Sequence, residues 1–359
     1  MGAADLSLRA ATKPERLATL TRLRAVLIGW VLVYHLELAL RALNGLPVAE
    51  AVALKGYLGV DGFFVLSGFA LVLGYRHSPP LGVAGWAGFV AKRAARLFPL
   101  HLAALALLAG MVGAAVLAGA AVNEPQRFGA FEFVMQALLL HAWETTEIHA
   151  WNYPSWALSA IWAGTLAFPL VLPALLARGP AACWAMVAVA LGGLGWLGAL
   201  PDAAQLNRTL HLGLLRFAFD FALGLALARL VTLRAVDAPA ATTLAGLLVP
   251  LGIWAGLDVL VVAGLAALVA RLGMQAPGQG AARDLAWRLG EASFGVYLAW
   301  VFVEAALVLL LRIADPGAAG RGVLMVLGLV ASFGLGWAAW RFVELPAGRW
   351  LAARRRFIA

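Results

Sequence analysis

The segment from Arg24 to His35 reads RAVLIGWVLVYH, with ten mostly apolar residues between its two polar ends. An α-helix turns about 100° per residue, so eleven steps bring the two side chains back to within ~20° of one face, about 16 Å apart along the axis. The apolar run continues to Leu43, and about 20 such residues cross a bilayer. We therefore expect Arg24 at the cytoplasmic boundary of a membrane span and His35 deep within it.

Each of these two polar residues has a plainer explanation that stays open. An imidazole inside a membrane is costly and usually faces a polar cavity, but His35 could instead bond a neighbouring helix. Arg24 could be an anchor whose guanidinium reaches the membrane interface.

The composition extends the membrane prediction to the whole chain. Of 359 residues, 63% are hydrophobic and 13% charged, and the mean hydropathy is +0.89. Soluble domains are about half apolar and a quarter charged, so lipid must cover much of this surface. The net charge of +9 fits basic cytoplasmic loops better than nucleic-acid binding. The expected fold class is an all-α integral membrane protein, a polytopic bundle of about ten transmembrane helices.

Ten apolar segments supply these spans. They are 25–43, 57–75, 97–121, 156–177, 181–200, 210–230, 241–256, 257–272, 289–311 and 322–341. With the N-terminus in the cytoplasm, most Arg and Lys residues fall on the cytoplasmic side, as the positive-inside rule requires. We therefore expect cytoplasmic basic tails at 1–24 and 347–359 around a single transmembrane domain, 25–346.

The segment 241–272 is the hardest to assign, being long for one helix and short for two. Pro250, Gly252, Gly256 and Asp258 near its middle are typical of a hairpin tip. A single span there would put the C-terminal arginines outside, so we expect two short helices.

The chain has one cysteine, Cys183, which excludes an internal disulfide and a thiolate metal cluster. The first apolar run lacks a small-residue cleavage site, so we expect it to remain as a span rather than be removed as a signal peptide. His141, Glu144, Glu147 and His149 form a polar cluster in a predicted outer loop. We expect no metal there, and a role in acceptor binding stays open.

Further segments match, in order, the motifs of a known family. They read GVDGFFVLSGF at 59–69, FVAKRAARLFP at 89–99, PSWALSAIW at 154–162 with Phe168-Pro169, SFGVYL at 293–298 and RFVELP at 341–346. Together with the Arg-x10-His pair, they resemble the membrane-bound acyltransferase 3 family, which includes many bacterial O-acetyltransferases of glycans. The resemblance spans about residues 19 to 351.

The resemblance implies an acyltransferase, in most cases an O-acetyltransferase, in the cytoplasmic (inner) membrane. It would move an acyl group from acyl-CoA, usually acetyl-CoA, to a hydroxyl of a cell-envelope or exported polysaccharide. Acyl-CoA would be a donor substrate and not a permanently bound cofactor. The expected partners are this donor, a free or lipid-linked carbohydrate acceptor and membrane lipids, with no nucleic acid.

The resemblance also implies roles for single residues. A neutral His35 would accept the proton of the acceptor hydroxyl as its oxygen attacks the thioester. Arg24 and the basic segment with Lys92, Arg93 and Arg96 would bind the phosphates of CoA. On a helix the last three form one cationic patch, which by itself would be an ordinary positive-inside cluster.

Asp61 begins the second span. It is expected to orient His35 or another polar group, or only to cap its helix. For Ser67-Gly68 we expect close helix packing. A role of Ser67 as nucleophile stays open, although the chain has no Gly-x-Ser-x-Gly motif to support it.

Trp151, Tyr153 and Trp156 lie at a predicted outer interface, where their rings could stack on a sugar. Together with Ser159 they are weak candidates for acceptor binding. The alternative is an aromatic belt at the membrane surface.

Three positions depart from the family pattern. Thr21-Arg22 stands where Asp-Gly is usual, Ile161 replaces a glutamate, and Trp300 replaces a histidine. These losses leave a second hypothesis open, a catalytically silent relative that binds or transports a lipid-linked glycan or an acyl donor. A transporter built of two halves would have matching broken helices, whereas only 241–272 is broken here.

Overall fold

The computed structural model describes residues 18–119, 122, 124–202, 205–275 and 284–355. These residues form helices and loops, and no strand occurs among them. The predicted all-α fold class is confirmed.

Ten helices of at least 16 residues correspond one by one to the ten predicted segments. They are α3 (Ala18–Leu40), α5 (Gly59–Tyr75), α6 (Gly82–Leu117), α8 (Trp156–Leu176), α9 (Pro180–Gly198), α10 (Gly213–Thr232), α11 (Ala238–Ala255), α12 (Asp258–Gly273), α13 (Leu285–Ile313) and α14 (Gly317–Ala339). Eight helical stretches of the described chain are long and apolar enough to cross a membrane. The other two long helices are α10, which contains three charged residues, and α12, which has only 16 residues. The protein is therefore a multi-pass membrane protein.

Shorter helices lie between the long ones and after α14. They are α4 (Pro47–Leu54), α7 (Ala130–Ala137), α15 (Leu345–Arg355) and the short turns η1 (Gly56–Leu58), η2 (Pro125–Phe128), η3 (Tyr153–Ser155) and the π-helical η4 (Trp340–Glu344).

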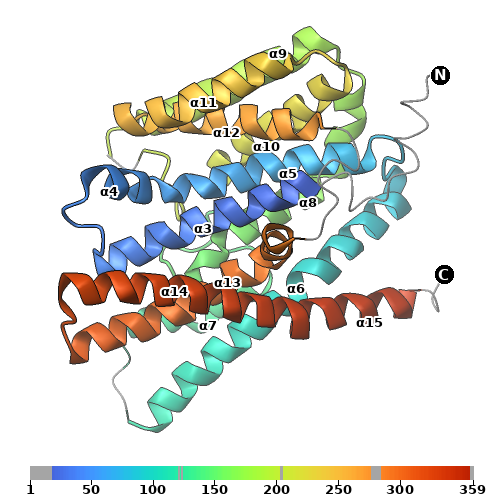
Figure 1. Ribbon diagram of the computed structural model, residues 1–359. Helices are drawn as coiled ribbons and strands as arrows, with labels where there is room; N and C mark the ends of the chain where they lie inside the picture. Colours follow the sequence, from blue (N-terminus) through green and yellow to red (C-terminus); the bar gives the residue numbers. More distant parts are fainter. Residues whose placement is uncertain (1–17, 120–121, 123, 203–204, 276–283, 356–359) are drawn as a thin grey trace.

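Helices α3 and α5 lie in the middle of the bundle. Helices α9, α11 and α12 lie on one side of them and α13 and α14 on the other, while α6 crosses at the edge (Figure 1). The starts of α3 and α13 and the interior of α6 meet the end of α5 around one cavity. We call this the basic end of the bundle, because Arg24, Lys92, Arg93 and Arg96 gather there, and the opposite end the far end.

Small residues let α5 and α10 approach closely. A Cβ on Gly224 would lie 2.0 Å from the carbonyl oxygen of Val65, and one on Gly68 would lie 2.4 Å from that of Phe221. Helices in membranes commonly pack through such small residues. The predicted packing role of Gly68 is thereby confirmed.

The segment 241–272 forms two helices, as predicted. Gly256, with φ +70°, ends α11 in the left-handed conformation that glycine adopts readily. The tip is shorter than expected, since Pro250 and Gly252 lie inside α11. Gly252 instead allows close packing, because a Cβ there would lie 2.7 Å from the backbone nitrogen of Val261.

Three helices extend beyond the predicted apolar segments. Helix α3 starts at Ala18, seven residues before the predicted span, and α6 starts at Gly82, fifteen residues before 97. Helix α15 covers 345–355, so much of the predicted tail 347–359 is helical. In each case the additional part of the helix carries basic residues. These residues do not end the helix, because a helical backbone satisfies its own hydrogen bonds whether its side chains face lipid, a cavity or water. Of the predicted tail 1–24, residues 1–17 lie outside the described part.

We expect Gly224→Ala to destabilise the protein by about 2 kcal/mol or more, because its new methyl group would collide with the backbone of α5. Gly246→Ala in α11 is the matched control. No atom outside its own helix backbone lies within 4 Å of its new Cβ, so it should be neutral or stabilising by up to ~1 kcal/mol. Thermal unfolding of both variants in detergent checks this, and equal midpoints would contradict the packing described.

Candidate functional site

A cavity of about 820 Å³ runs along α5 inside the bundle. Helix α5 lines it from Tyr75 at the basic end to Val60, and fifteen helical steps correspond to about 22 Å. The other walls come from α3, α6, α8, α10, α13 and the junction of α14 with α15. Away from the basic end the lining is largely apolar and closes at Val60, Ala157 and Tyr297.

All four predicted phosphate-binding residues line this cavity. Arg24 comes from α3, and Lys92, Arg93 and Arg96 come from the interior of α6, ten to fourteen residues after its start at Gly82. Arg24 is therefore directed into a cavity and is not an anchor at the lipid surface. The structure brings together cations that are about 70 residues apart in the sequence.

Two carboxylates that we did not predict from the sequence accompany the cations. Oε1 of Glu291 lies 3.8 Å from a guanidinium nitrogen of Arg24, and Oε1 of Glu344 lies 3.8 Å from Nε of Arg96. A signal was present in the sequence, because Glu291 is an acidic residue at the start of an apolar span and Glu344 belongs to the RFVELP motif.

His35 lies beyond the closed end of the cavity. It is not among the lining residues, and the start of α5 at Gly59 already packs against Leu27 and Val31 of α3. Helix α3 runs from Ala18 to Leu40, so that Arg24 lies six residues after its start and His35 five residues before its end. The expected spacing of the two residues along one helix is retained, and the depth of His35 in the membrane stays a prediction.

Aromatic rings enclose His35. The indole of Trp300 stacks on the imidazole, with ring centroids 3.9 Å apart, and Tyr34 meets it edge-on at 4.9 Å. Among the described residues we find no hydrogen-bond partner for the imidazole, so the alternative of a bond to a neighbouring helix gains no support.

Trp300 and Tyr297 separate the cavity from His35. Tyr297 lines the cavity and donates its hydroxyl hydrogen bond to the carbonyl of Pro154. Trp300, one turn further along α13, is 1% exposed, and its indole N–H has no partner among the described residues. Trp300 therefore fills the space beside His35. Ile161, at the other family departure, adds an apolar surface to the cavity wall.

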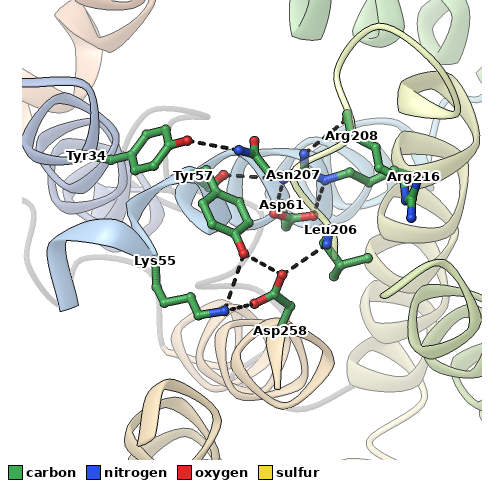
Figure 2. A network of polar contacts seen from close by, with 9 residues as sticks. All are labelled: Tyr34, Lys55, Tyr57, Asp61, Leu206, Asn207, Arg208, Arg216 and Asp258. Atoms are coloured by element: carbon green, nitrogen blue, oxygen red, sulfur yellow. Dashed lines mark hydrogen bonds and ion pairs between the residues drawn. The ribbon is translucent and has the colours of Figure 1, made fainter. Parts of the chain in front are cut away.

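Asp61 pairs with an arginine that sequence analysis missed. Its carboxylate accepts two hydrogen bonds from Arg216 of α10, at 2.7 and 2.5 Å, and both side chains are buried (Figure 2). Asp61 neither caps α5 nor contacts His35 through a hydrogen bond. Arg216 also donates to the backbone carbonyls of Tyr57 and Arg208. Asp220, one turn after Arg216, is fully buried too.

A second polar group closes the far end beside this pair. Asp258, at the start of α12, accepts from Nζ of Lys55 at 2.6 Å, from the Tyr57 hydroxyl at 2.5 Å and from the Leu206 backbone at 3.0 Å (Figure 2). The hydroxyl of Tyr34, next to His35, accepts from Asn207. These contacts fix the loop before α10 to α3, η1 and α12.

Three of the four predicted acceptor-binding residues have structural partners. The indole N–H of Trp151 donates to the Gly129 carbonyl, and Trp156 is buried in the core. Ser159 is fully buried and donates to the Leu139 carbonyl.

Tyr153 is placed differently from these three. Its ring meets Trp300 edge-on at 5.9 Å, and its hydroxyl lies 3.4 Å from Oε2 of Glu304. Tyr153 is therefore the predicted acceptor residue that lies closest to the rings around His35.

The outer polar cluster makes local contacts. Nδ1 of His211 lies 3.0 Å from Oε2 of Glu144, and this hydrogen bond raises the pKa of His211 above its ordinary value. Oε1 of Glu144 also accepts from the Leu212 backbone. In the part of the chain that the structure describes, no three His, Cys, Asp or Glu side chains are arranged to hold a metal ion.

We expect Asp61→Asn to lower the free energy of unfolding by about 3–5 kcal/mol, because it leaves the buried Arg216 without its charged partner. The matched control is Asp315→Asn, which breaks a pair with Arg321 in which Asp315 is 73% exposed and should cost about 1 kcal/mol or less. Thermal unfolding in detergent measures both. An Asp61→Asn protein of unchanged stability that has lost activity would contradict the structural role.

Comparison with known proteins assigns the chain to a family. The family model described as acyltransferase domain, of the acyltransferase 3 type, matches residues 17–341, a range that contains the cavity and His35. Acyltransferase MdmB of Streptomyces mycarofaciens is 34% identical over 121 residues, which are 32% of this chain and 28% of that relative's length. No solved structure matches the chain. The protein therefore belongs to the acyltransferase 3 family.

Proposed function

We propose that the protein is a membrane O-acyltransferase that moves an acyl group, acetyl in the simplest case, from acyl-CoA to a hydroxyl of a cell-envelope or exported polysaccharide. The observation that carries the proposal is the cavity lined by four cations, one of which, Arg24, lies on the same helix α3 as His35. Family membership and the acyltransferase relative support the same reaction class.

The cavity suits the shape and charge of CoA. Its phosphates would bind Arg24 and Arg96, because guanidinium groups form strong paired hydrogen bonds to phosphate. The nucleotide would lie toward Lys92 and Arg93 at the opening, and the pantetheine arm would extend along α5 toward Tyr297. About 16 Å of helix axis separates Arg24 from His35, a distance that an extended arm can cover.

His35 would act as general base. Its imidazole would accept the proton of the acceptor hydroxyl while the oxygen forms a bond to the acyl carbon. The carbon–sulfur bond would break, and the thiolate of CoA would leave and take up that proton from the imidazolium. The imidazole has no hydrogen-bond partner among the described residues, so a ring nitrogen would be available to the hydroxyl.

The donor and acceptor would approach His35 from opposite ends of the bundle. The basic end would face the cytoplasm of a bacterial inner membrane, where positive residues accumulate and where acyl-CoA is present. The acceptor would reach His35 from the far end, past Tyr153. For the thioester to meet His35, the indole of Trp300 would have to move away from the imidazole, or the pantetheine arm of CoA would have to pass beside the indole.

The stacking of Trp300 on His35 also supports the rival hypothesis of a catalytically silent relative. In that case the cavity would bind an acyl donor or a lipid-linked glycan without reaction. The transfer assay described next distinguishes the hypotheses, because a silent relative would show no transfer even without a substitution.

We expect His35→Ala to reduce acyl transfer by about 10²–10⁴-fold, the typical loss when a general base is removed. Transfer of radiolabelled acetyl from acetyl-CoA to envelope glycan measures this. His77→Ala, in the exposed turn after α5, is the control and should retain activity. Full activity of His35→Ala would contradict the mechanism.

Arg24→Ala should raise the KM for acyl-CoA by roughly 10–100-fold, because a charged hydrogen bond contributes about 1.5–3 kcal/mol. Arg22→Ala is a matched control two residues earlier. Arg22 pairs with Asp284 at 2.9 Å and does not line the cavity, so its KM should change little. Equal effects of the two variants would argue against phosphate binding by Arg24.

A further inference from the structure

Glu291 places negative charge inside a cavity whose proposed ligand is itself negative, and Glu344 places a second negative charge beside the lining residue Arg96. Glu291 lines the cavity opposite Arg24, and Glu344 lies between two lining residues of the α14–α15 junction, Trp340 and Leu345. A site that only had to attract phosphate would gain from arginines without carboxylates. The two acids therefore need an explanation that phosphate binding alone does not give.

The two pairs are loose. Both closest N–O distances are 3.8 Å, whereas charge-assisted hydrogen bonds are usually about 2.7–2.9 Å long. The bidentate Asp61–Arg216 pair, at 2.5 and 2.7 Å, shows that this fold also builds tight ion pairs. The carboxylates thus neutralise Arg24 and Arg96 without occupying their hydrogen-bond donors.

Glu344 is held in place by an unusual piece of backbone. It ends the π-helical turn η4, and such turns occur frequently at functional sites. Its side chain is only 10% exposed, and its Oε2 atom is buried without a hydrogen-bond partner among the described residues. A buried acceptor without a partner is costly, so the fold retains Glu344 at a cost to stability.

The net charge around the cavity indicates how Glu291 and Glu344 affect an anionic ligand. The cavity contains four cations, and subtracting the two carboxylates leaves a net charge of +2. Both acids act on Arg24, since the charges that surround it include Glu291 and Glu344, and Glu344 also acts on Arg96. When an anion binds to these arginines, the same carboxylates become like charges beside it.

We infer that Glu291 and Glu344 balance the charge of Arg24 and Arg96 in the empty cavity and compete with the phosphates of CoA, so that the product does not stay bound. The inference rests on the proposed function, because it takes CoA as the ligand. It adds two residues that weaken ligand binding and thereby favour release.

Removing these two negative charges should increase the affinity for CoA, although most substitutions in a binding site decrease it. Glu291→Gln and Glu344→Gln keep the shape of each side chain and remove its charge, so both should bind CoA more tightly, by roughly tenfold. A purely structural role would predict the reverse, because misplaced arginines bind phosphate less well. Pantetheine carries no phosphate, so its affinity should not change.

The experiment is calorimetric titration of CoA and of pantetheine into the purified full chain in detergent. The variants are Glu291→Gln and Glu344→Gln, with Asp284→Asn as the matched control. Asp284 also pairs with an arginine at the basic end, but it lies outside the cavity, and asparagine preserves its cap on α13. The expected result is tighter CoA binding by both glutamine variants and unchanged binding by Asp284→Asn.

The outcomes separate the inference from the proposed function. If the unaltered protein does not bind CoA, the proposed function and this inference both fail. If it binds CoA and the glutamine variants bind it equally or more weakly, the inference alone is overturned. Should Glu344→Gln fail to fold, Glu291→Gln decides, because the Glu291 side chain is 30% exposed and tolerates the change.

Discussion

The ion pair between Asp61 and Arg216 fixes the position of α5, and the cavity depends on that helix. A charge buried in a membrane protein must be paired inside the bundle, and these two side chains leave almost no surface exposed. Their contact joins the start of α5 to α10, and the glycine contacts around Val65 continue the same interface. Helix α5 then presents its other face to the cavity along its length.

The proposed reaction divides between the two ends of the bundle. The basic end provides cations for the anionic part of a donor, and the far end provides the imidazole of His35 among aromatic rings. Trp300 lies where the two parts meet. Such a partition would keep water from the thioester until an acceptor arrives.

The hydropathy of the sequence was sufficient to predict the helices, because lipid demands long apolar runs and the hairpin at 241–272 has clear turn residues. The start of α6 was missed because charged residues such as Lys92 look like a loop, although they line a cavity. Arg216 and Glu344 were missed for a related reason. Their importance comes from contacts across more than 150 and more than 240 residues of sequence respectively, and no local pattern encodes such distances.

If CoA occupies the cavity along α5 between the cations and His35, it covers Ser67, midway along this wall. Ser67 is changed to cysteine in a protein whose buried Cys183 has been replaced by serine. The rate at which a small maleimide alkylates this single thiol is then compared with and without saturating CoA. We expect CoA to slow the alkylation strongly. An unchanged rate, with CoA binding verified in the same sample, would show that CoA does not occupy the cavity.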